Sequence, residues 1–351
     1  MNLGLTESLP SLVSRRFVAA KDSGNLIFSA TQLAILSSKR GIGYQLRYCP
    51  ALAKKPETQS QPSNPTGPKP DPFENPSTDL LITEVPSTSK THFLILNKFP
   101  VIPNHFILAT KRFEKQTDLL EKEDLGIAYA CLEAWFDGDD DGLVRKEEKG
   151  GGRRLFAFFN SGEESGASQP HRHLQFLPIE DMRAQLEDSK SDNSSVSWTP
   201  LIDLFLTSTN VQISSSGIRH LPNLPFQNFA LQIRSPPSID ALHEMYVTLY
   251  RAALLASRMT SPEETARTSG PAAISYNLAM TRDIMMIVPR KKEAHTIPGL
   301  PDADAVSLNG TILAGTLMVK TKEQWDHLRR DAEVISELFG EVGIASYSSH
   351  L

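Results

Sequence analysis

The chain has 351 residues, of which 40% are hydrophobic and 22% charged, fractions that are ordinary for a water-soluble protein. Its formal net charge of −5 argues against non-specific nucleic-acid binding, so any anion site must be built locally. Cys49 and Cys131 have no metal-binding spacing and favour a reducing compartment. No apolar run approaches the ~18 residues of a membrane span, so we expect a cytoplasmic protein, with the nucleus as the alternative.

The first third of the chain is predicted to contain one helix, several strands and a proline-rich loop. Apolar residues at helical spacing predict a helix over residues 8–22. Seven prolines within residues 56–76 predict a mobile surface loop rather than a packed element. His105, which alternates with Ile107, is interpreted as a core or edge histidine. The predicted strands are residues 26–30, 44–52, 80–85, 92–97 and 105–110.

A helix is predicted over residues 114–136, and it runs into an acidic segment, residues 137–152. The aspartates at 137, 139 and 141, with Gly142 and Glu148, match the twelve-residue calcium loop of an EF-hand. Three glycines at 150–152 then occupy the place where an exiting helix is required, and no second such loop is present. We therefore interpret the segment as a solvated acidic loop rather than a calcium site.

The most informative stretch is residues 160–180, NSGEESGASQPHRHLQFLPIE. A turn rich in glycine and serine precedes a predicted strand that begins at His171. Because successive side chains of a strand point to opposite faces, His171, His173 and Gln175 share one face. Two imidazoles and a carboxamide in a row, after a loop of small residues, are typical of a phosphate-handling site.

Three interpretations of this histidine pair stay open on the residues alone. Imidazoles at i and i+2 can bind a metal ion, although the next residue on that face is Gln175, a poor ligand. The pair can also be structural, although core packing does not require the preceding loop. In the third interpretation, which we favour, one neutral imidazole attacks a phosphoryl group while loop N–H groups hold the phosphate oxygens.

The second half of the chain faintly repeats the first. It is predicted to contain helices at 198–206, 240–259 and 322–339, with strands at 229–233 and 316–320. Aligning residues 287–289 on 176–178 places Ile284 at the position of His173 and Met286 at that of Gln175. Such a copy would keep the strand and lose the nucleophile.

The segment GASQPHRHLQ resembles the active-site signature of the transferase branch of the histidine-triad superfamily, His-x-His-x-Gln. The hydrolase branch has a third histidine where Gln175 stands. The similarity is strongest to the diadenosine tetraphosphate phosphorylase (ATP adenylyltransferase) family, to which galactose-1-phosphate uridylyltransferase is more distantly related. Further matching segments span nearly the whole chain, at 48–56, 93–113, 276–293 and 307–320.

This resemblance implies an α+β fold in which helices flank a histidine-triad-like antiparallel sheet built from two degenerate halves. We expect the catalytic strand in an N-terminal half, residues 1–180, and nucleotide-binding strands with a terminal helix in residues 181–351. It also implies that His173 is the nucleophile, that His171 orients it or hands over a proton, and that Gln175 donates a hydrogen bond. The residues implied to bind nucleotide and phosphates are Lys54, Leu96, Asn97, Asn160, Ser165, Gly166, Ala167, Ser168, Gln169, Gln175, Asn309, Gly310, Thr311, Thr316 and Lys320.

Several of these positions also have a plainer interpretation. Lys54 can be a solvated loop residue, Asn97 a turn residue before a proline bend, and Lys320 an ordinary lysine at a strand end. At the position of Thr316 the family often carries methionine, so the chain departs from the pattern there.

The implied reaction is cleavage of diadenosine tetraphosphate by phosphate into ATP and ADP through an adenylyl-histidine, which is reversible and can include ADP-sulfate/phosphate exchange. We expect a divalent cation, Mg²⁺, bound through the polyphosphate and no metal held by the protein. We expect a monomer whose partners are small molecules. We expect it to bind neither nucleic acid nor a membrane. The alternatives are another nucleotidyltransferase, such as a hexose-1-phosphate uridylyltransferase, and a histidine-ligated metal protein.

Overall fold

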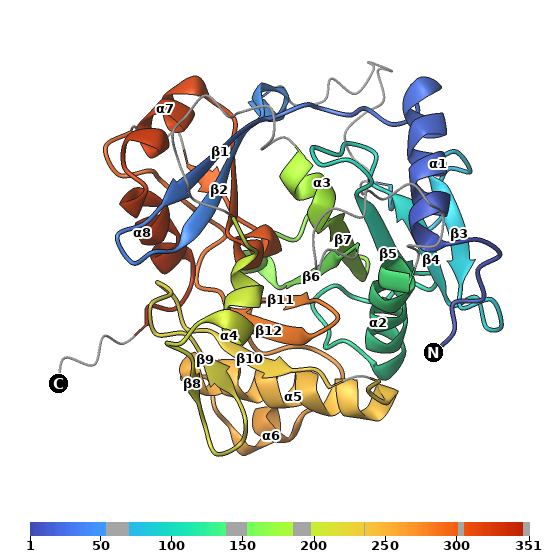
Figure 1. Ribbon diagram of the computed structural model, residues 1–351. Helices are drawn as coiled ribbons and strands as arrows, with labels where there is room; N and C mark the ends of the chain where they lie inside the picture. Colours follow the sequence, from blue (N-terminus) through green and yellow to red (C-terminus); the bar gives the residue numbers. More distant parts are fainter. Residues whose placement is uncertain (54–69, 138–152, 185–197, 235, 301–304, 347–351) are drawn as a thin grey trace.

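One ten-stranded sheet runs through the molecule, and its neighbouring strands are all antiparallel (Figure 1). The computed structural model describes the chain except residues 54–69, 138–152, 185–197, 235, 301–304 and 347–351. The strands lie in the order β3 (Leu81–Val85), β4 (His92–Leu96), β5 (Phe106–Thr110), β7 (His173–Pro178), β6 (Leu155–Ser161), β11 (Tyr276–Met280), β12 (Ile284–Pro289), β10 (Phe229–Gln232), β9 (Arg219–His220) and β8 (Gln212–Ile213).

The described residues form two further sheets. In the first, β1 (Gln32–Ser37) pairs with β2 (Gly43–Tyr48), and β2 pairs in parallel with β15 (Thr316–Val319). The second is the short pair β13 (Ala294–His295) and β14 (Val306–Ser307). Strands from residues 1–180 and 181–351 therefore share the two larger sheets.

Helices and the smaller sheets cover the two faces of the main sheet with separate hydrophobic cores. On one face pack α1 (Leu9–Asp22), α2 (Lys122–Phe136) and α5 (Ile239–Ala256). The other core contains the β1–β2–β15 sheet, α7 (Lys322–Arg330) and α8 (Glu333–Val342), which lie together on the left of Figure 1. The shorter helices are η1 (Pro50–Ala53), η3 (Glu163–Ser165), α3 (Ile179–Arg183), η5 (Leu201–Asp203), α4 (Leu204–Thr207), α6 (Pro262–Ala266) and η7 (Gly310–Ala314).

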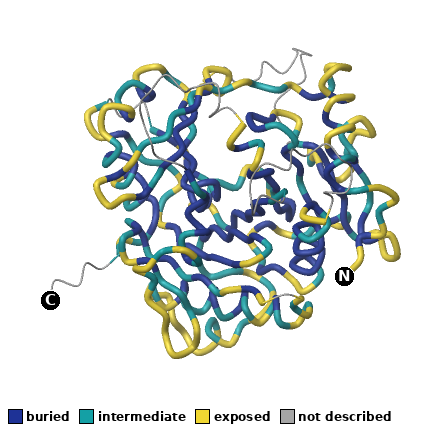
Figure 2. Tube along the Cα trace, in the orientation of Figure 1, coloured by how far each residue is buried: buried dark blue, intermediate teal, exposed yellow. Residues whose placement is uncertain are grey.

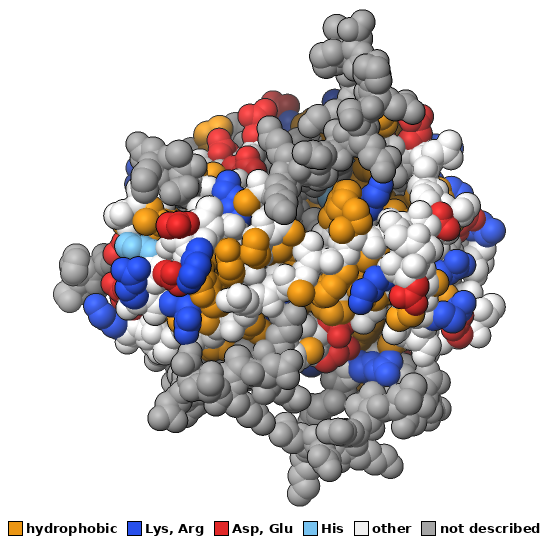
Figure 3. Space-filling model, turned by 90° about the horizontal axis from the view of Figure 1, so that it is seen from above, with side chains coloured by type: hydrophobic (Ala, Val, Ile, Leu, Met, Phe, Trp, Pro, Cys, Tyr) orange, Lys and Arg blue, Asp and Glu red, His pale blue; other side chains and the backbone are white. Residues whose placement is uncertain are grey.

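The burial of the chain follows this layering. Figure 2 shows that the buried trace is concentrated along the central strands, while exposed segments lie mostly at the periphery. Viewed from above, apolar side chains gather over the middle of the surface, with charged groups mainly toward the margins (Figure 3).

The order and register of the elements are similar in the two predicted halves. The first contains β4, β5, α2, β6 and β7, the second contains β9, β10, α5, β11 and β12, and the halves meet where β6 pairs with β11. Pro178 of β7 lies opposite Leu155 at the start of β6, and Pro289 of β12 lies opposite Tyr276 at the start of β11. The register therefore agrees with the alignment that places Ile284 on His173.

Four predicted elements were wrong in extent. The strand predicted over residues 44–52 ends at Tyr48, since Pro50–Ala53 form the short helix η1. Residues 26–30 form no assigned strand, although the N–H groups of Ile27 and Ser29 donate to the carbonyls of Lys98 and Pro100. The helix predicted from residue 114 begins at Lys122, because the preceding backbone pairs with distant segments at 170–171 and 270–272. The C-terminal helix is two helices, since residue 331 has an extended backbone with φ −142° and ψ 104°.

The prediction for the proline-rich loop was wrong at its C-terminal end. Residues 70–76 pack against the protein: Phe73 is buried, and the Asp71 carboxylate contacts His171. Prolines did not prevent this, because turns tolerate them and the aromatic and acidic side chains find partners. The remainder of that loop and residues 138–152 of the predicted acidic loop lie outside the described residues.

Candidate active site

The predicted row of polar side chains lies in the middle of the main sheet. β7 is hydrogen-bonded between β5 and β6, with His173 opposite Ala109 and Gln175 opposite both Ile107 and Phe158. Arg172, between the histidines, points to the other face, where its guanidinium pairs with Asp124 of α2 at 3.0 Å. The alternation expected from the sequence is therefore present.

The hydrogen bonding of His173 fixes which ring nitrogen is available for chemistry. Its Nδ1 lies 2.8 Å from the carbonyl oxygen of His171, which can only accept, so Nδ1 carries the hydrogen. In the neutral ring this leaves the lone pair on Nε2. Burial lowers the pKa of His173 to about 4, so the ring is neutral at physiological pH. The site therefore contains a neutral imidazole suited to nucleophilic attack.

Both ring nitrogens of His171 are engaged by the protein. Nδ1 lies 2.6 Å from Oδ2 of Asp71, while Nε2 lies 3.0 Å from the carbonyl oxygen of Arg112 and from Oγ1 of Thr110. The ring thus has no free nitrogen with which to protonate a leaving phosphate. Of the two roles implied by the sequence, this geometry supports orientation of the site.

Gln175 is oriented by a chain of hydrogen bonds that ends in a backbone N–H group. The amide of Phe99 donates to Oδ1 of Asn97 at 2.9 Å, so Nδ2 of Asn97 faces Nδ1 of His105 at 3.1 Å. His105 then carries its hydrogen on Nε2 and donates to Oε1 of Gln175 at 3.0 Å. The amide NH₂ group of Gln175 is left to donate elsewhere. Burial lowers the pKa of His105 to about 4, which keeps this tautomer neutral.

His105 is buried, as its interpretation as a core or edge histidine predicts, but that interpretation did not foresee its hydrogen bond to Gln175. Its place two residues before Ile107, directly before the strand beside β7, was the available signal. Asn97 also forms the predicted turn through its bond to the Phe99 amide, so the plainer interpretation of this residue holds together with its link to Gln175.

A buried glutamine that the sequence analysis did not identify separates the ends of β6 and β7. Paired residues of these strands extend only to Phe158 and Gln175. Beyond them, Oε1 of Gln116 accepts from the His173 amide at 2.7 Å, and its Nε2 donates to the carbonyls of Asn160 at 2.7 Å and His173 at 3.2 Å. One side-chain amide thus replaces the direct pairing of Asn160 with His173.

Several predicted phosphate-binding residues come together around Asn160. Its Oδ1 accepts from the Gly310 amide at 2.8 Å and from Nδ2 of Asn277 at 2.9 Å. Asn277 also donates to the carbonyl of Ser165 at 2.9 Å. Gly166 has φ +78°, and a Cβ there would lie 2.7 Å from the Leu308 carbonyl, so only glycine lets the two loops approach.

The loop that follows presents backbone donors. The N–H groups of Ala167, Ser168 and Gln169 make no hydrogen bond with any residue that the structure describes. The hydroxyl of Ser165 instead donates to the Gly162 carbonyl at 2.6 Å. This loop therefore offers main-chain N–H groups, rather than the Ser165 side chain, to an anion.

Comparison with known proteins identifies the family. Residues 3–144 and 151–188 match the model of the Ap4A phosphorylase N-terminal domain, and residues 222–345 match the ATP adenylyltransferase C-terminal domain. The chain belongs to the Ap4A phosphorylase family. It is therefore an enzyme, a nucleotidyltransferase of the ATP adenylyltransferase type.

Individual relatives agree over the full length. Two proteins of Saccharomyces cerevisiae are similar: diadenosine 5',5'''-P1,P4-tetraphosphate phosphorylase 2, 28% identical over 97% of this chain and 95% of the relative, and Protein APA1, 26% identical over 99% and 97%. The crystal structure of yeast Ap4A phosphorylase Apa2 has a TM-score of 0.74 at 25% identity, covering 97% of this chain and 99% of that chain. A structure of Apa2 with AMP has a TM-score of 0.75 at 24% identity, covering 99% and 100%.

In this member of the Ap4A phosphorylase family, a buried arginine missed by the sequence analysis supports the Asn160 cluster. Arg290 follows β12, and its Nη1 donates to Oδ1 of Asn277. Its remaining donors reach the carbonyls of Leu308 at 3.0 Å, Lys292 at 2.8 Å and Val342 at 3.2 Å. Desolvation lowers the pKa of Arg290 to about 10, so it is a cation at neutral pH.

The remaining predicted site residues lie in different environments. Leu96 is buried in the core on the face of the sheet opposite the histidines, so the structure does not bring its side chain to them. The Asn309 side chain accepts from the Thr311 amide at 3.0 Å, and the fully buried Thr316 hydroxyl donates to Gln45. Lys320 is exposed just after β15. Lys54 lies outside the described residues.

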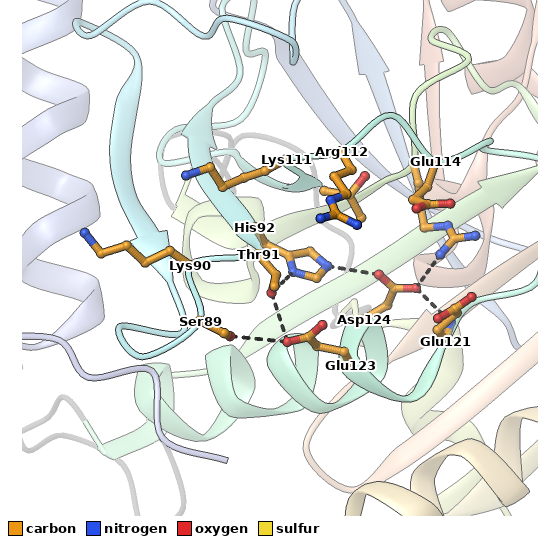
Figure 4. Close-up of a pocket in the computed structure, with 12 residues that line it drawn as sticks. Ser89, Lys90, Thr91, His92, Lys111, Arg112, Glu114, Glu121, Glu123 and Asp124 are labelled. Carbon is orange, nitrogen blue, oxygen red and sulfur yellow. Dashed lines mark hydrogen bonds and ion pairs between the residues drawn. The ribbon is translucent and has the colours of Figure 1, made fainter.

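Behind the catalytic strand lies a cavity of about 610 Å³, shown in Figure 4. On its floor Asp124 links Arg172 to His92, with both contacts at 3.0 Å. Lys111 and Arg112 lie along its upper side, and Glu121 and Glu123 lie below with the helix α2. These mixed charges fix the back of β7, and they do not form a site for an ion of one sign.

Proposed function

We propose that this chain cleaves diadenosine tetraphosphate with inorganic phosphate, giving ATP and ADP, and that the AMP group passes through Nε2 of His173. The observation that carries the proposal is the neutral His173 ring, whose Nδ1–H is held by the His171 carbonyl so that Nε2 has the lone pair. Family membership supports it, as do the solved structures of yeast Apa2 with Ap4A and with AMP.

In the first step, Nε2 of His173 attacks the α-phosphorus of the substrate. A P–N bond forms, the bond from that phosphorus to the bridging oxygen breaks, and ATP leaves with the electron pair. The amide of Gln175 and the N–H groups of the 167–169 loop donate to the phosphoryl oxygens as their charge increases. Each well-placed donor of this kind contributes about 3 kcal/mol to transition-state stabilisation.

In the second step, an oxygen of inorganic phosphate attacks the same phosphorus. The P–N bond breaks, ADP forms, and the electron pair returns to Nε2 of His173. In each displacement a phosphate oxygen and Nε2 of His173 replace one another on the same phosphorus, so the reaction can run in either direction. Splitting the transfer in two is what a nucleophilic residue contributes.

Charge on the polyphosphate is offset by Lys54, Lys320 and Mg²⁺ in this proposal. Among the residues described, no group of three or more His, Cys, Asp or Glu side chains could hold a metal ion. Phosphate oxygens with bound water are common Mg²⁺ ligands, so the ion is expected to enter with the nucleotide. Asn97, with the turn from Asn309 to Thr316, is proposed to border the nucleoside, whereas the buried Leu96 on the other face of the sheet is not.

The family relationship supports small-molecule substrates. No helix in the described part of the chain is long and apolar enough to cross a membrane. A monomeric state and a cytoplasmic or nuclear location stay predictions.

The test is incubation of the purified protein with diadenosine tetraphosphate and Mg²⁺, with and without phosphate, followed by separation of the products. ATP and ADP that form only with phosphate support the proposal. Formation of AMP and ATP without phosphate would identify a hydrolase. Intact-protein mass spectrometry without phosphate should detect one AMP group per chain, absent from His173→Ala.

A further inference from the structure

A carboxylate from the end of the proline-rich segment reaches the catalytic strand. Oδ2 of Asp71 lies 2.6 Å from Nδ1 of His171, which is 100 residues further along the chain. The two side chains are 19% and 1% exposed, respectively. A short contact between an acid and a base with so little access to water is a strong, directional interaction.

The partners of the ring indicate its protonation state. Nε2 of His171 faces the carbonyl oxygen of Arg112 at 3.0 Å, and a carbonyl can only accept, so Nε2 carries a hydrogen. Nδ1 faces the carboxylate of Asp71, which is an acceptor when ionised. The ring is therefore held at both nitrogens, with Nε2 donating to the Arg112 carbonyl and Nδ1 sharing a short hydrogen bond with Asp71.

Aromatic side chains enclose this ion pair. The ring of Phe73, two residues after Asp71, lies edge-on to His171 at 5.7 Å and packs against His173 at 5.1 Å between centroids. Phe113 contacts His171 from another side at 5.3 Å. The segment that brings the carboxylate thus also covers both histidines, and its apolar rings strengthen the ion pair by excluding water.

The backbone of His171 connects this pair to the nucleophile. Its carbonyl oxygen is the acceptor that holds Nδ1–H of His173 at 2.8 Å. A His171 ring held only at Nε2 can tilt, and a tilt of the ring would shift the backbone at that carbonyl. His173 would then populate the other tautomer, in which Nε2 carries the hydrogen and cannot attack.

We propose that Asp71 is a positioning residue for nucleotidyl transfer, acting through His171 to hold the carbonyl that fixes the tautomer of His173. This inference rests on the proposed role of His173 as the nucleophile. It also gives the end of the proline-rich segment a part in the reaction, since that segment supplies both the carboxylate and the ring of Phe73.

The test compares Asp71→Ala and Asp71→Asn with the parent protein and with Asp203→Asn. Asp203 is a matched control, because it is a buried aspartate in an ion pair, with Arg154 at 2.7 Å, and has no contact with the histidines.

The measurements are kcat and KM for phosphorolysis and the single-turnover rate at which AMP attaches to the protein. We expect Asp71→Ala to lower kcat and the attachment rate on the order of 10- to 100-fold, the usual cost of removing a carboxylate that orients a functional histidine. KM should change less than about 2-fold, since Asp71 binds no substrate in this proposal.

A second readout reports the ring itself and remains informative if Asp71→Ala folds poorly. Long-range ¹H–¹⁵N spectra of histidine-labelled protein, with His171 assigned through His171→Gln, should show two protonated ring nitrogens in the parent at neutral pH. In Asp71→Asn the ring should lose the Nδ1 hydrogen, because the new amide can donate to Nδ1 and keep the ring in place. That variant should retain more activity than Asp71→Ala.

Parent-like kcat and attachment rate in both Asp71 variants would overturn the proposal, as would a singly protonated His171 ring in the parent. The proposed function fails differently: if the parent itself never acquires AMP on His173, the nucleophile is wrong, whatever the Asp71 variants do.

Discussion

β7 and β12 occupy equivalent places in the two halves of the sheet, yet they share almost no chemistry. β7 presents His173 and Gln175 where β12 presents Ile284 and Met286. β12 is buried along all six residues, whereas Gln175 stays partly accessible. The comparison shows that this fold needs only apolar side chains at these positions, so the polar residues of β7 reflect a requirement of the site.

The segments that precede the two strands differ as well. β11 passes to β12 through residues 281–283, whereas β6 passes to β7 through residues 162–172, which contain the donor loop and the turn at η3. The second half still contributes, since Asn277 and Arg290 hold Asn160 in place. One half therefore carries the reacting groups, while the other positions them.

The most severe way to test this contrast is to make β7 resemble β12 at its first position. His173→Ile, or the milder His173→Ala, removes the only Nε2 placed for attack in the proposed route. We expect turnover to fall by roughly 10⁴-fold or more, as is typical when a catalytic nucleophile is deleted. Steady-state assays and mass spectrometry of the AMP adduct measure this, and normal turnover in either variant would refute the assignment of His173.

The second exchange is Gln175→Met, which copies Met286. Loss of one preorganised donor to the phosphoryl oxygens should lower kcat on the order of 10²- to 10³-fold. The free energy of unfolding should change little by comparison, because the native β12 accommodates methionine at this place. Matched assays of kcat and chemical denaturation check this, and a loss of stability without a change in kcat would make Gln175 structural.

The supporting half is tested by Arg290→Met. The substitution leaves Oδ1 of Asn277 and the carbonyl of Leu308 buried without the arginine that donates to them. We expect the free energy of unfolding to fall by roughly 2 to 4 kcal/mol, measured by urea denaturation. Arg282→Met is the control in the same half: its ion pair with Glu133 is partly exposed, and such pairs contribute at most about 1 kcal/mol. Equal losses in the two variants would contradict this account of Arg290.

The pH dependence of stability tests the two buried histidines of the first half. His173 and His105 have pKa values lowered by burial from about 6.5 to about 4. Between these values the unfolded chain takes up protons that the folded protein does not, so stability falls as the pH drops from about 6.5 to 4. Each histidine contributes at most roughly 3 kcal/mol to this loss. Denaturation of His105→Gln across this range should show a shallower decline, and an unchanged slope would contradict the lowered pKa.

The mildest test is Met286→Leu in β12. Since the position is fully buried and apolar, a volume-conserving exchange should cost less than about 1.5 kcal/mol and leave kcat unchanged. Denaturation and the phosphorolysis assay check this together. A large loss of activity would mean that β12 takes part in the reaction.

The reactive residues of β7 could be predicted from the sequence because their arrangement depends on local spacing. The alternation from His171 to Gln175 and the alignment of Ile284 on His173 needed only neighbouring residues. Asp71 and Gln116 escaped prediction because their partners are 100 and 57 residues away, and no periodicity marks a single buried carboxylate or amide. The late start of α2 has the same origin, since distant backbone partners outweigh the helical pattern of residues 114–121.

The side chain of Gln116 has a consequence for how such a site arises. Because it lies between Asn160 and His173, it prevents β6 and β7 from pairing directly at the position of the nucleophile. One carboxamide spans that opening, and it hydrogen-bonds the Asn160 carbonyl and both peptide groups of His173 that it reaches. Installing the same reactivity beside β12 would therefore require more than grafted histidines: the 281–283 connection would have to be lengthened and a wedge of similar size provided.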